Sequence, residues 1–462
     1  MTDAALKDLQ TILTANQVTG SAPDLQTYGK DWSIYYAANP SLIVFPETEK
    51  NVVDLVLWAR KHKVPLVPSG GRTGLSSAAT ATNKEVVVAF DRMNKILDFN
   101  ETDLVLTVQP GVITETVQNF AEEKGYYYPV DFAAVGSSQM GGTVATNAGG
   151  VKVVKYGLTR NWISGLKVVT GAGESLYLNK SLKKNATGYD LRHLLIGSEG
   201  TLGFFTQIEI QLTSQPKELK VLVLGLEQLE HSLEVFRTFN KKMSVTACEF
   251  FSHQAMQKVL AAHSKLSAPF ETQAPFYLLL EVEQTGEGSA ELIESLFSDC
   301  FENGWVSDGV ISQNSTQSEN FWSLREYISE SISPFTPYKN DVSVRVSRAP
   351  EFVKTTQEII QKSYPDWEVI WFGHIGDGNL HINILKPDGL SREDFIKKCQ
   401  GADDLLYQQI AKFDGSVSAE HGVGLAKKKF LHYSRSPQEI EILKQIKKIF
   451  DPDNIINPGK IF

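Results

Sequence analysis

The sequence predicts an α+β protein, and three observations indicate this class. Up to residue 215, short β-rich runs are separated by clusters of glycine. From residue 216 to 413, strand-like and helix-like segments alternate, which predicts an antiparallel sheet with helices on one face. A chain of 462 residues also exceeds the size at which single cores stop growing, so several domains are expected. We therefore divide the chain into segments 1–215, 216–413 and 414–462.

Apolar periodicity predicts the elements of the first segment. A helix at 50–62 follows from the helical spacing of Val52, Val53, Leu55 and Val56. Residues 1–18 are polar enough to form a short surface helix. The expected strands are 40–45, 64–67, 86–90, 104–108, 166–170 and 204–212.

The rest of the chain has longer and clearer elements. The expected strands are 220–226, 245–251 and 276–283, and the expected helices are 229–241, 289–303, 392–413 and 437–450. The helix at 392–413 is supported by the spacing of Phe395, Ile396, Leu405, Leu406 and Ile410.

Composition argues against several classes of protein. The net charge is −9 and no dense stretch of lysine and arginine occurs, which argues against a nucleic-acid partner. Cys248, Cys300 and Cys399 are few and scattered, as are the reduced thiols of cytosolic proteins. The N-terminal residues lack the features of a signal or transit peptide, and no apolar run is long enough to span a bilayer. We expect a cytoplasmic location, with peripheral membrane contact left open.

The most informative segment is His374-Ile-Gly-Asp-Gly-Asn-Leu-His381, followed further along the chain by Glu420-His421-Gly-Val-Gly. Apolar residues on both sides of the first segment predict a tight turn between two buried strands. The turn would bring the two imidazoles to one point. With the carboxylate of Glu420 they form a ligand set for a borderline divalent metal, with a place left open for substrate. His421 is then a free base beside the site.

The alternative for these residues is a structural role. Gly-Asp-Gly-Asn is a good turn sequence in any protein, and isolated histidines are usually ordinary, partly buried residues. The chain has only nine histidines, however, and His374, His381 and His421 all fall in these two short segments. We therefore favour the metal site.

Three glycine-rich loops lie in the first 215 residues, at 68–76, 136–150 and 195–203. Glycine lets a backbone approach a ligand closely, and successive N–H groups form a concavity for anions such as a diphosphate. Loops of this kind with interleaved Ser, Thr and Asn predict a long extended ligand; the alternative is a β domain with many tight turns. Neither a GxGxxG fingerprint nor a P-loop occurs, which disfavours a Rossmann site or a nucleotide triphosphatase.

Together these motifs resemble those of the FAD-linked oxidases of the vanillyl-alcohol-oxidase type and, among them, of the D-2-hydroxyacid dehydrogenases. The resemblance spans nearly the whole chain. It is carried by Gly-Gly-x-Thr-Gly-Leu-Ser at 70–76, Gly-Gly-x-x-Ala-Thr-Asn-Ala-Gly-Gly at 141–150, Gly-Ser-Glu-Gly-Thr-Leu-Gly at 197–203, the HxGDGNxH turn, the Glu420 motif and Asn457-Pro-Gly-Lys.

The resemblance implies an FAD-binding domain of two α+β subdomains at 1–215, a substrate domain at 216–413, and a segment 414–462 that returns to the flavin. Some relatives attach the flavin covalently through a histidine in the first loop; Arg72 stands in that region, so non-covalent FAD is expected. The residues implied to bind FAD are Pro68, Gly70, Gly71, Arg72, Thr73, Gly74, Ser137, Gly141, Gly142, Thr146, Gly150, Glu199 and Asn457.

The same resemblance implies roles for the later residues. His421 would be the catalytic base. The implied ligands of the divalent metal, with zinc favoured over manganese and iron, are His374, His381 and Glu420. The implied substrate residues are Arg325, Ser329, Lys339 and Asn383.

Arg325 matches the family's carboxylate-binding arginine, whose planar guanidinium can grip a carboxylate in two places. Without the resemblance, we would interpret Arg325 as a surface helix charge paired with Glu326 or Ser329. Arg345 departs from the family, which often has proline there, and could alter the selectivity for the acid.

The implied reaction is oxidation of a D-2-hydroxy acid to a 2-oxo acid by hydride transfer to FAD. The expected electron acceptor is a quinone, a cytochrome or an electron-transfer flavoprotein. Lys339 and Arg345 favour a dicarboxylate such as D-2-hydroxyglutarate, whereas D-lactate or glycolate would need Arg325 alone. A metal-dependent hydrolase and a subunit that is inactive outside a larger oxidase complex are the other functions considered. Whether the chain forms a homodimer is left open.

Overall fold

The computed structural model describes residues 2–462, and the chain separates into two compact units. The first unit contains Met1–Gly149, Gly157–Gln215 and Glu420–Phe462. The second unit contains Gly150–Tyr156 and Pro216–Ala419. Each unit has its own sheets and its own buried core.

One sheet of the first unit has four strands in the order β1-β2-β4-β3. The strands are β1 (Val18–Thr19), β2 (Leu42–Val44), β3 (Leu66–Ser69) and β4 (Val86–Ala89). Both β2 and β3 run parallel to β4, and the helix α3 (Glu49–His62) connects β2 to β3. Thr48 caps α3 by accepting the N–H of Asn51, and the helix buries Leu55 and Val56. The predicted helix at 50–62 is confirmed.

A second sheet of the first unit has five antiparallel strands in the order β5-β6-β10-β8-β9. They are β5 (Ile96–Asn100), β6 (Val105–Val108), β8 (Ile163–Thr170), β9 (Ser175–Leu178) and β10 (Gly203–Gln211). The helices α4 (Thr114–Glu123), α5 (Met140–Thr146) and α7 (Arg192–Leu195) share its apolar core. A separate core holds α3 together with α1 (Asp3–Ile12).

The smaller elements of the first unit are α2 (Ala22–Tyr28) and the antiparallel pair of β7 (Tyr126–Tyr127) and β11 (Thr213–Ser214). The end of the chain packs into two of the apolar cores of this unit. Phe450, the last residue of α15 (Pro437–Phe450), belongs to the core of the five-stranded sheet, and Ile455 and Ile456 belong to the core of α3. Ile456 also forms a parallel bridge with Leu66 of β3. The predicted helix at 437–450 is confirmed.

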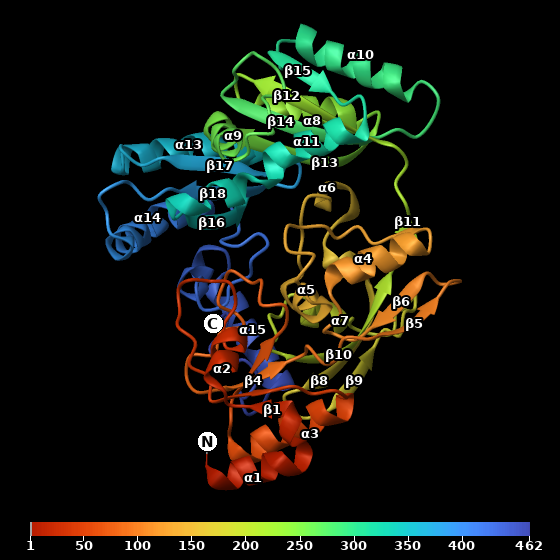
Figure 1. Cartoon of the computed structure of the whole chain (residues 1–462), viewed down its shortest axis with the longest axis vertical. Helices are drawn as coiled ribbons and strands as arrows, with labels where there is room; N and C mark the ends of the chain where they lie inside the picture. The colour runs from red at the N-terminus through yellow and green to blue at the C-terminus, as the bar shows by residue number, and fades with distance from the viewer. Residues whose placement is uncertain (1) are drawn as a thin grey trace. The chain divides into compact units, whose positions relative to one another are not determined.

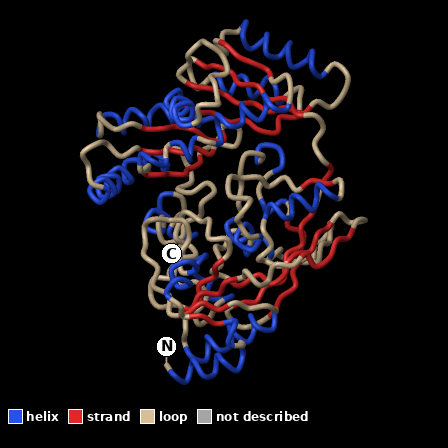
Figure 2. Tube along the Cα trace, in the orientation of Figure 1, coloured by secondary structure: helices blue, strands red, loops and turns tan. Residues whose placement is uncertain are grey.

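The second unit is built on one antiparallel sheet of seven strands in the order β15-β12-β14-β13-β17-β18-β16, drawn red in Figure 2. The strands are β12 (Leu219–Leu226), β13 (Ser244–Ser252), β14 (Phe276–Glu283), β15 (Asp308–Ile311), β16 (Tyr338–Ser343), β17 (Val369–His374) and β18 (Asn379–Ile384). The predicted antiparallel sheet is confirmed, together with its predicted strands at 220–226, 245–251 and 276–283.

Helices cover both faces of this sheet (Figure 1). Ile370 packs with α9 (His253–Ala262), α11 (Ser315–Glu326) and α12 (Ile328–Ser331). Its neighbour Val369 points to the opposite face and packs with α14 (Arg392–Lys412). The prediction of helices on one face is wrong, because successive residues along the central strands are apolar and require cover on both sides. The other helices of the unit are α6 (Val153–Tyr156), α8 (His231–Asn240), α10 (Ser289–Glu302) and α13 (Ala349–Ser363).

The helix α5 was not expected, because it lies inside the second glycine-rich run. Glycine has a low helix propensity, but Met140 and Val144 are fully buried and their packing outweighs it. A Cβ added at Gly141 would lie 2.8 Å from Cβ of Pro110, so close packing also favours glycine at that position.

Two expectations from composition can be compared with the structure. Cys248, Cys300 and Cys399 are buried free thiols, as predicted. Within residues 2–462, every helix is either too short or too polar to cross a membrane.

Candidate active site

The predicted turn between two buried strands is confirmed. β17 ends at His374 and β18 begins at Asn379, and these two residues are paired across the hairpin. The N–H of Gly378 donates to the carbonyl oxygen of His374, which closes the turn. Gly378 has φ +85°, and a Cβ there would lie 2.0 Å from the carbonyl oxygen of Val344, so no larger residue fits.

Strand register places both histidines on one face of the sheet. His381 pairs with Phe372, which lies two residues before His374 on β17, so the two imidazoles project on the same side. Their ring centroids are 5.4 Å apart and the ring planes are inclined at 81°. The structure therefore brings together two of the three predicted metal ligands.

The same register gathers further polar residues on this face. Asp341 of β16 pairs with His381, and Phe251 of β13 pairs with Phe372, which puts Glu249 of β13 on that side as well. Lys339 of β16 pairs with Asn383 of β18 on the same face. Four adjacent strands thus contribute the polar set Glu249, His374, His381, Asn383, Asp341 and Lys339.

Glu249 connects a predicted metal ligand to a predicted substrate residue. Its Oε1 lies 2.7 Å from Nδ1 of His374, and its Oε2 lies 2.8 Å from Nη2 of Arg325. Burial raises the pKa of Glu249, but the charges of His374 and Arg325 outweigh burial and hold this pKa below its usual value. Arg325 is buried and its guanidinium lies over the ring of Phe372, 4.7 Å from the centroid. The alternative of a surface charge paired with Glu326 or Ser329 is therefore wrong.

Asp341 contacts both the hairpin and the residue that precedes Glu420. Its Oδ1 accepts a hydrogen bond of 2.8 Å from Nδ2 of Asn379 and lies 3.8 Å from Nδ1 of His381. Its Oδ2 accepts the N–H of Ala419 at 3.2 Å. Asp341 therefore holds the last residue before Glu420 close to the histidine hairpin.

The predicted substrate residues all lie in the same unit. Nζ of Lys339 donates to Oγ of Ser329 at 3.1 Å, and burial lowers the pKa of Lys339. Two buried donors, Nε of Arg325 and Nδ2 of Asn383, find no hydrogen-bond partner among residues 2–462. Buried donors are normally paired, so unpaired ones suggest a ligand that supplies oxygen acceptors.

Glu420 and His421 belong to the first unit, and their approach to the two histidines stays a prediction. The loop that carries His421 is held by Glu199: the N–H groups of Val423 and Gly424 donate to its two carboxylate oxygens, each at 2.7 Å. Burial raises the pKa of Glu199 to about 6, although these two N–H groups oppose the shift.

A cavity in the first unit is lined by all three glycine-rich loops. Oε1 of Gln139, which lines it, is buried and accepts no hydrogen bond from the described part of the chain. The predicted FAD residues on its wall are Pro68, Gly70, Gly141, Gly142, Thr146 and Glu199. A groove floored by glycine backbone, with an unpaired polar atom, fits an elongated cofactor such as FAD.

The remaining predicted FAD residues do not line this cavity. Arg72 pairs with Asp91, and Asn457 is fully buried and donates to the carbonyl oxygens of Ala78 and Glu199. Gly71 is required by close packing, since a Cβ there would lie 2.2 Å from the carbonyl oxygen of Ser137. Gly150 lies in the second unit. Thr73, Gly74 and Ser137 are the other predicted FAD residues that lie outside the lining of this cavity.

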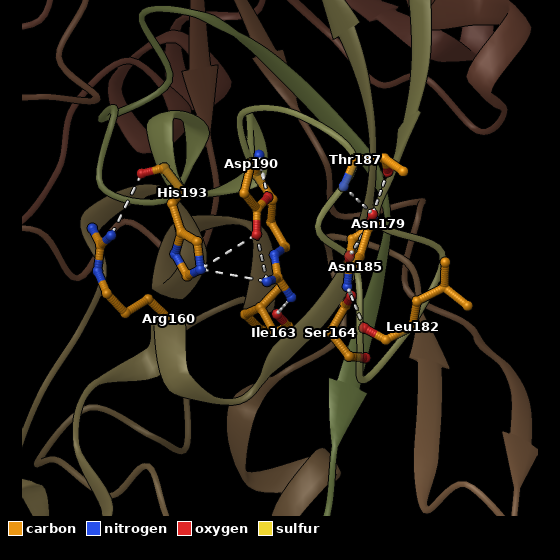
Figure 3. Close-up of polar contacts among 10 residues, drawn as sticks. Arg160, Ile163, Ser164, Asn179, Leu182, Asn185, Thr187, Asp190 and His193 are labelled. Atoms are coloured by element: carbon orange, nitrogen blue, oxygen red, sulfur yellow. Dashed lines mark hydrogen bonds and ion pairs between the residues drawn. The ribbon is translucent and has the colours of Figure 1, made fainter.

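Two arginines contact the chain near the start of the third glycine-rich loop, and Figure 3 shows the contact of Arg160 with the carbonyl oxygen of His193. Nη2 of Arg160 donates to the carbonyl oxygen of Ile196, and Nη1 of Arg192 donates to that of Ile163 on β8. The backbone N–H of Arg160 also donates to Oδ1 of Asn147, which ends the second loop's helix. These contacts fix the second and third loops against each other.

Comparison with known proteins assigns the family. The C-terminal domain of FAD-linked oxidases matches residues 215–461, and an FAD-binding domain matches residues 40–179. The chain belongs to the FAD-linked oxidases.

Several relatives of this FAD-linked oxidase are similar over most or all of their length. A D-2-hydroxyglutarate dehydrogenase from Stutzerimonas stutzeri is 55% identical, with 100% of both chains covered. One from Xanthomonas citri is 48% identical, covering 100% of this chain and 98% of the relative. The mitochondrial D-2-hydroxyglutarate dehydrogenase of Bos taurus is 34% identical, covering 95% and 80%.

Solved structures confirm the predicted fold. An alkyldihydroxyacetonephosphate synthase gives a TM-score of 0.77 at 18% identity, covering 100% of this chain and 86% of the synthase. A p-cresol methylhydroxylase gives 0.75 at 17% identity, covering 99% and 96%. The predicted α+β fold with a flavin-binding part of the vanillyl-alcohol-oxidase type is thus confirmed, as is the use of FAD.

Sequence reasoning missed two acidic residues of this FAD-linked oxidase. Glu249 interrupts the apolar strand Val245–Phe251, and a buried charge in such a strand needs a specific partner. The acidic residue within an apolar strand could have drawn attention to Glu249, but it does not indicate that His374 and Arg325 are its partners. Asp341 lies beside Lys339 and Asn340, and its role depends on pairing with a strand that begins at Asn379.

Proposed function

We propose that this FAD-dependent oxidoreductase oxidises a D-2-hydroxy acid, with D-2-hydroxyglutarate favoured, to the 2-oxo acid, and that it requires a divalent metal. The observation that carries the proposal is the set of polar residues on one face of the seven-stranded sheet, where two imidazoles lie near a buried arginine. Relatives named as D-2-hydroxyglutarate dehydrogenases, at up to 55% identity over the whole chain, support it.

Substrate binding is assigned to Arg325, Ser329, Lys339 and Asn383. The unpaired Nε of Arg325 and Nδ2 of Asn383 would donate to carboxylate oxygens, which removes the cost of leaving these donors buried and unpaired. A carboxylate beside Nζ of Lys339 would also oppose the burial that lowers its pKa. Two separate cations suit a dicarboxylate, whereas D-lactate or glycolate would use Arg325 alone.

Metal binding is assigned to His374, His381 and Glu420. The donor set of two imidazoles and a carboxylate suits zinc, and also manganese or iron. The contact between Nδ1 of His374 and Glu249 leaves Nε2 of that ring as the nitrogen able to bind an ion. Glu420 directly follows Ala419, whose N–H Asp341 holds, and this short covalent connection supports its place as third ligand.

The FAD site is assigned to the cavity of the first unit and its glycine-rich loops. Residues 1–215 would form the FAD-binding domain, 216–413 the substrate domain, and 414–462 a segment that returns to the flavin. Arg72 has its guanidinium paired with Asp91 and offers no nucleophile, which supports non-covalent binding.

The chain's own residues then divide the work of the reaction. FAD would accept the C2 hydride, and a divalent ion held by His374, His381 and Glu420 would make the hydroxyl group more acidic. Arg325 orients the substrate by its carboxylate, and His421 takes the hydroxyl proton. A quinone, a cytochrome or an electron-transfer flavoprotein would then take the electrons.

One screen tests the proposal. The purified yellow protein is assayed by dye reduction with D-2-hydroxyglutarate, D-malate, D-lactate and glycolate, with and without a chelator. We expect the highest kcat/KM with D-2-hydroxyglutarate, and loss of turnover in chelator with FAD still bound. Preference for D-lactate would assign the alternative substrate class, and full activity after removal of the metal would overturn the metal requirement.

A further inference from the structure

Glu249 occupies an unusual position for a carboxylate. It lies in the middle of β13, a strand whose other residues are mostly apolar, and its side chain is 1% exposed. Burying a charged group is costly unless it is paired, and removing one partner of a buried pair is strongly destabilising. Such a residue needs a specific reason to be there.

The two oxygens of Glu249 have different partners on different elements. Oε1 contacts Nδ1 of His374 at the end of β17, and Oε2 contacts Nη2 of Arg325 near the end of α11. The first distance is 2.7 Å and the second is 2.8 Å. A rotation of the His374 ring would break its hydrogen bond to Glu249, and a displacement of the Arg325 guanidinium would break its ion pair with Glu249.

Each contact selects the atoms that stay available for a ligand. With Nδ1 of His374 engaged, a metal can bind at Nε2 of that ring alone. With Nη2 of Arg325 engaged, its Nε is a buried donor without a partner in the described chain. The side chain of Glu249 therefore orients both the metal-binding imidazole of His374 and the carboxylate-binding guanidinium of Arg325.

We infer that Glu249 is a positioning residue that couples the metal-binding histidine to the carboxylate-binding arginine. The inference deepens the proposed function, since it assumes that His374 binds metal and Arg325 binds substrate. A substrate whose hydroxyl meets the metal and whose carboxylate meets Arg325 would then be held at a spacing that Glu249 maintains.

The substitution Glu249→Gln tests this coupling. An amide can offer its oxygen to one partner, but its NH₂ group then faces the other partner, which is also a donor. We expect the variant to keep FAD, to bind zinc about 10–100-fold more weakly in chelator competition, and to raise the KM for D-2-hydroxyglutarate at saturating zinc. Both the dissociation constant for zinc and the KM should change, because the carboxylate of Glu249 contacts both His374 and Arg325.

Glu281→Gln is the matched control. Glu281 is a buried carboxylate on the adjacent strand β14 and faces the same side of the sheet, but it pairs with Lys152 and contacts Trp322. This variant should lower the melting temperature without changing zinc affinity or KM. If Glu249→Gln yields no folded protein, Glu249→Asp serves instead, because its shorter side chain keeps the charge but cannot span both partners.

The outcomes separate the inference from the proposed function. If wild-type protein binds zinc and His374→Ala does not, the metal assignment stands. A Glu249→Gln variant with unchanged zinc affinity and KM, and only a lower melting temperature like that of Glu281→Gln, would then overturn the inference alone. A wild-type protein that binds no divalent ion would overturn both.

Discussion

Glu199 and Gly424 are 225 residues apart in the sequence, yet the N–H of Gly424 donates to Oε2 of Glu199 at 2.7 Å. The other carboxylate oxygen accepts the N–H of Val423 at the same distance. Gly422 has φ +76°, and a Cβ there would lie 2.8 Å from the carboxyl carbon of Glu199. The loop that carries His421 is thus fitted around one buried carboxylate of the third glycine-rich loop.

This contact predicts a pH dependence of stability. Burial raises the pKa of Glu199 from 4.5 to about 6, so the folded state binds a proton more readily than the unfolded state. The resulting stabilisation is fully present below pH 4.5 and is lost as the pH rises through about 6. The shift corresponds to roughly 2 kcal/mol. Urea unfolding of wild type and Glu199→Gln from pH 4.5 to 7.5 checks this; parallel curves for the two proteins would contradict it.

Gly71→Ala should abolish or greatly weaken FAD binding. The added Cβ would lie 2.2 Å from the carbonyl oxygen of Ser137, so the first and second glycine-rich loops must separate. Flavin absorbance per protein after purification measures the effect. Gly286→Ala is the control, since within residues 2–462 a Cβ there meets no atom within 4 Å. Wild-type flavin content in Gly71→Ala would show that the two loops can move apart without harm.

His374→Ala should lose the metal and keep FAD. Zinc affinity should fall by more than the roughly 10–100-fold typical of an outer-shell partner, because a ligand itself is removed. Elemental analysis together with flavin absorbance separates the two cofactors. His263→Ala is the control: this histidine stacks on Tyr327 in the same unit and belongs to no predicted site. Equal metal content in the two variants would end the assignment of His374.

His421→Ala should slow the reduction of the flavin by substrate by about 10²–10⁴-fold, the usual contribution of a general base. Metal and FAD contents should stay at wild-type levels, because Glu199 holds this loop through the backbone of Val423 and Gly424. Stopped-flow measurement of flavin bleaching gives the rate directly. Reduction at the wild-type rate would require another base.

Lys339→Met should separate dicarboxylates from monocarboxylates. The change keeps an unbranched side chain, one atom shorter, but removes its charge, so the KM for D-2-hydroxyglutarate should rise about 10–100-fold, while that for D-lactate should change little. Arg345→Ala is the control, since Arg345 is exposed and its charge is solvated. A larger effect from Arg345→Ala would move the second carboxylate site from Lys339 to Arg345.

The sequence by itself determined the class of fold and indicated the residues that we propose for the chemistry. The helices at 50–62 and 437–450 follow from local apolar spacing, and so does the hairpin that presents His374 and His381. These features depend on short-range periodicity and on glycines that specific turns require, and both are visible in a single chain.

Tertiary structure decided what covers each face and what holds each functional side chain. The helix α5 forms against its glycine content because Met140 and Val144 are buried in a core assembled from distant strands. The pairing of Glu249 with His374 and Arg325 depends on strand register across β13 and β17, and on the packing of α11 over them. The contacts of Glu249 with Arg325 and His374 join residues more than seventy positions apart. The packing of whole elements determines them, and local sequence patterns do not predict them.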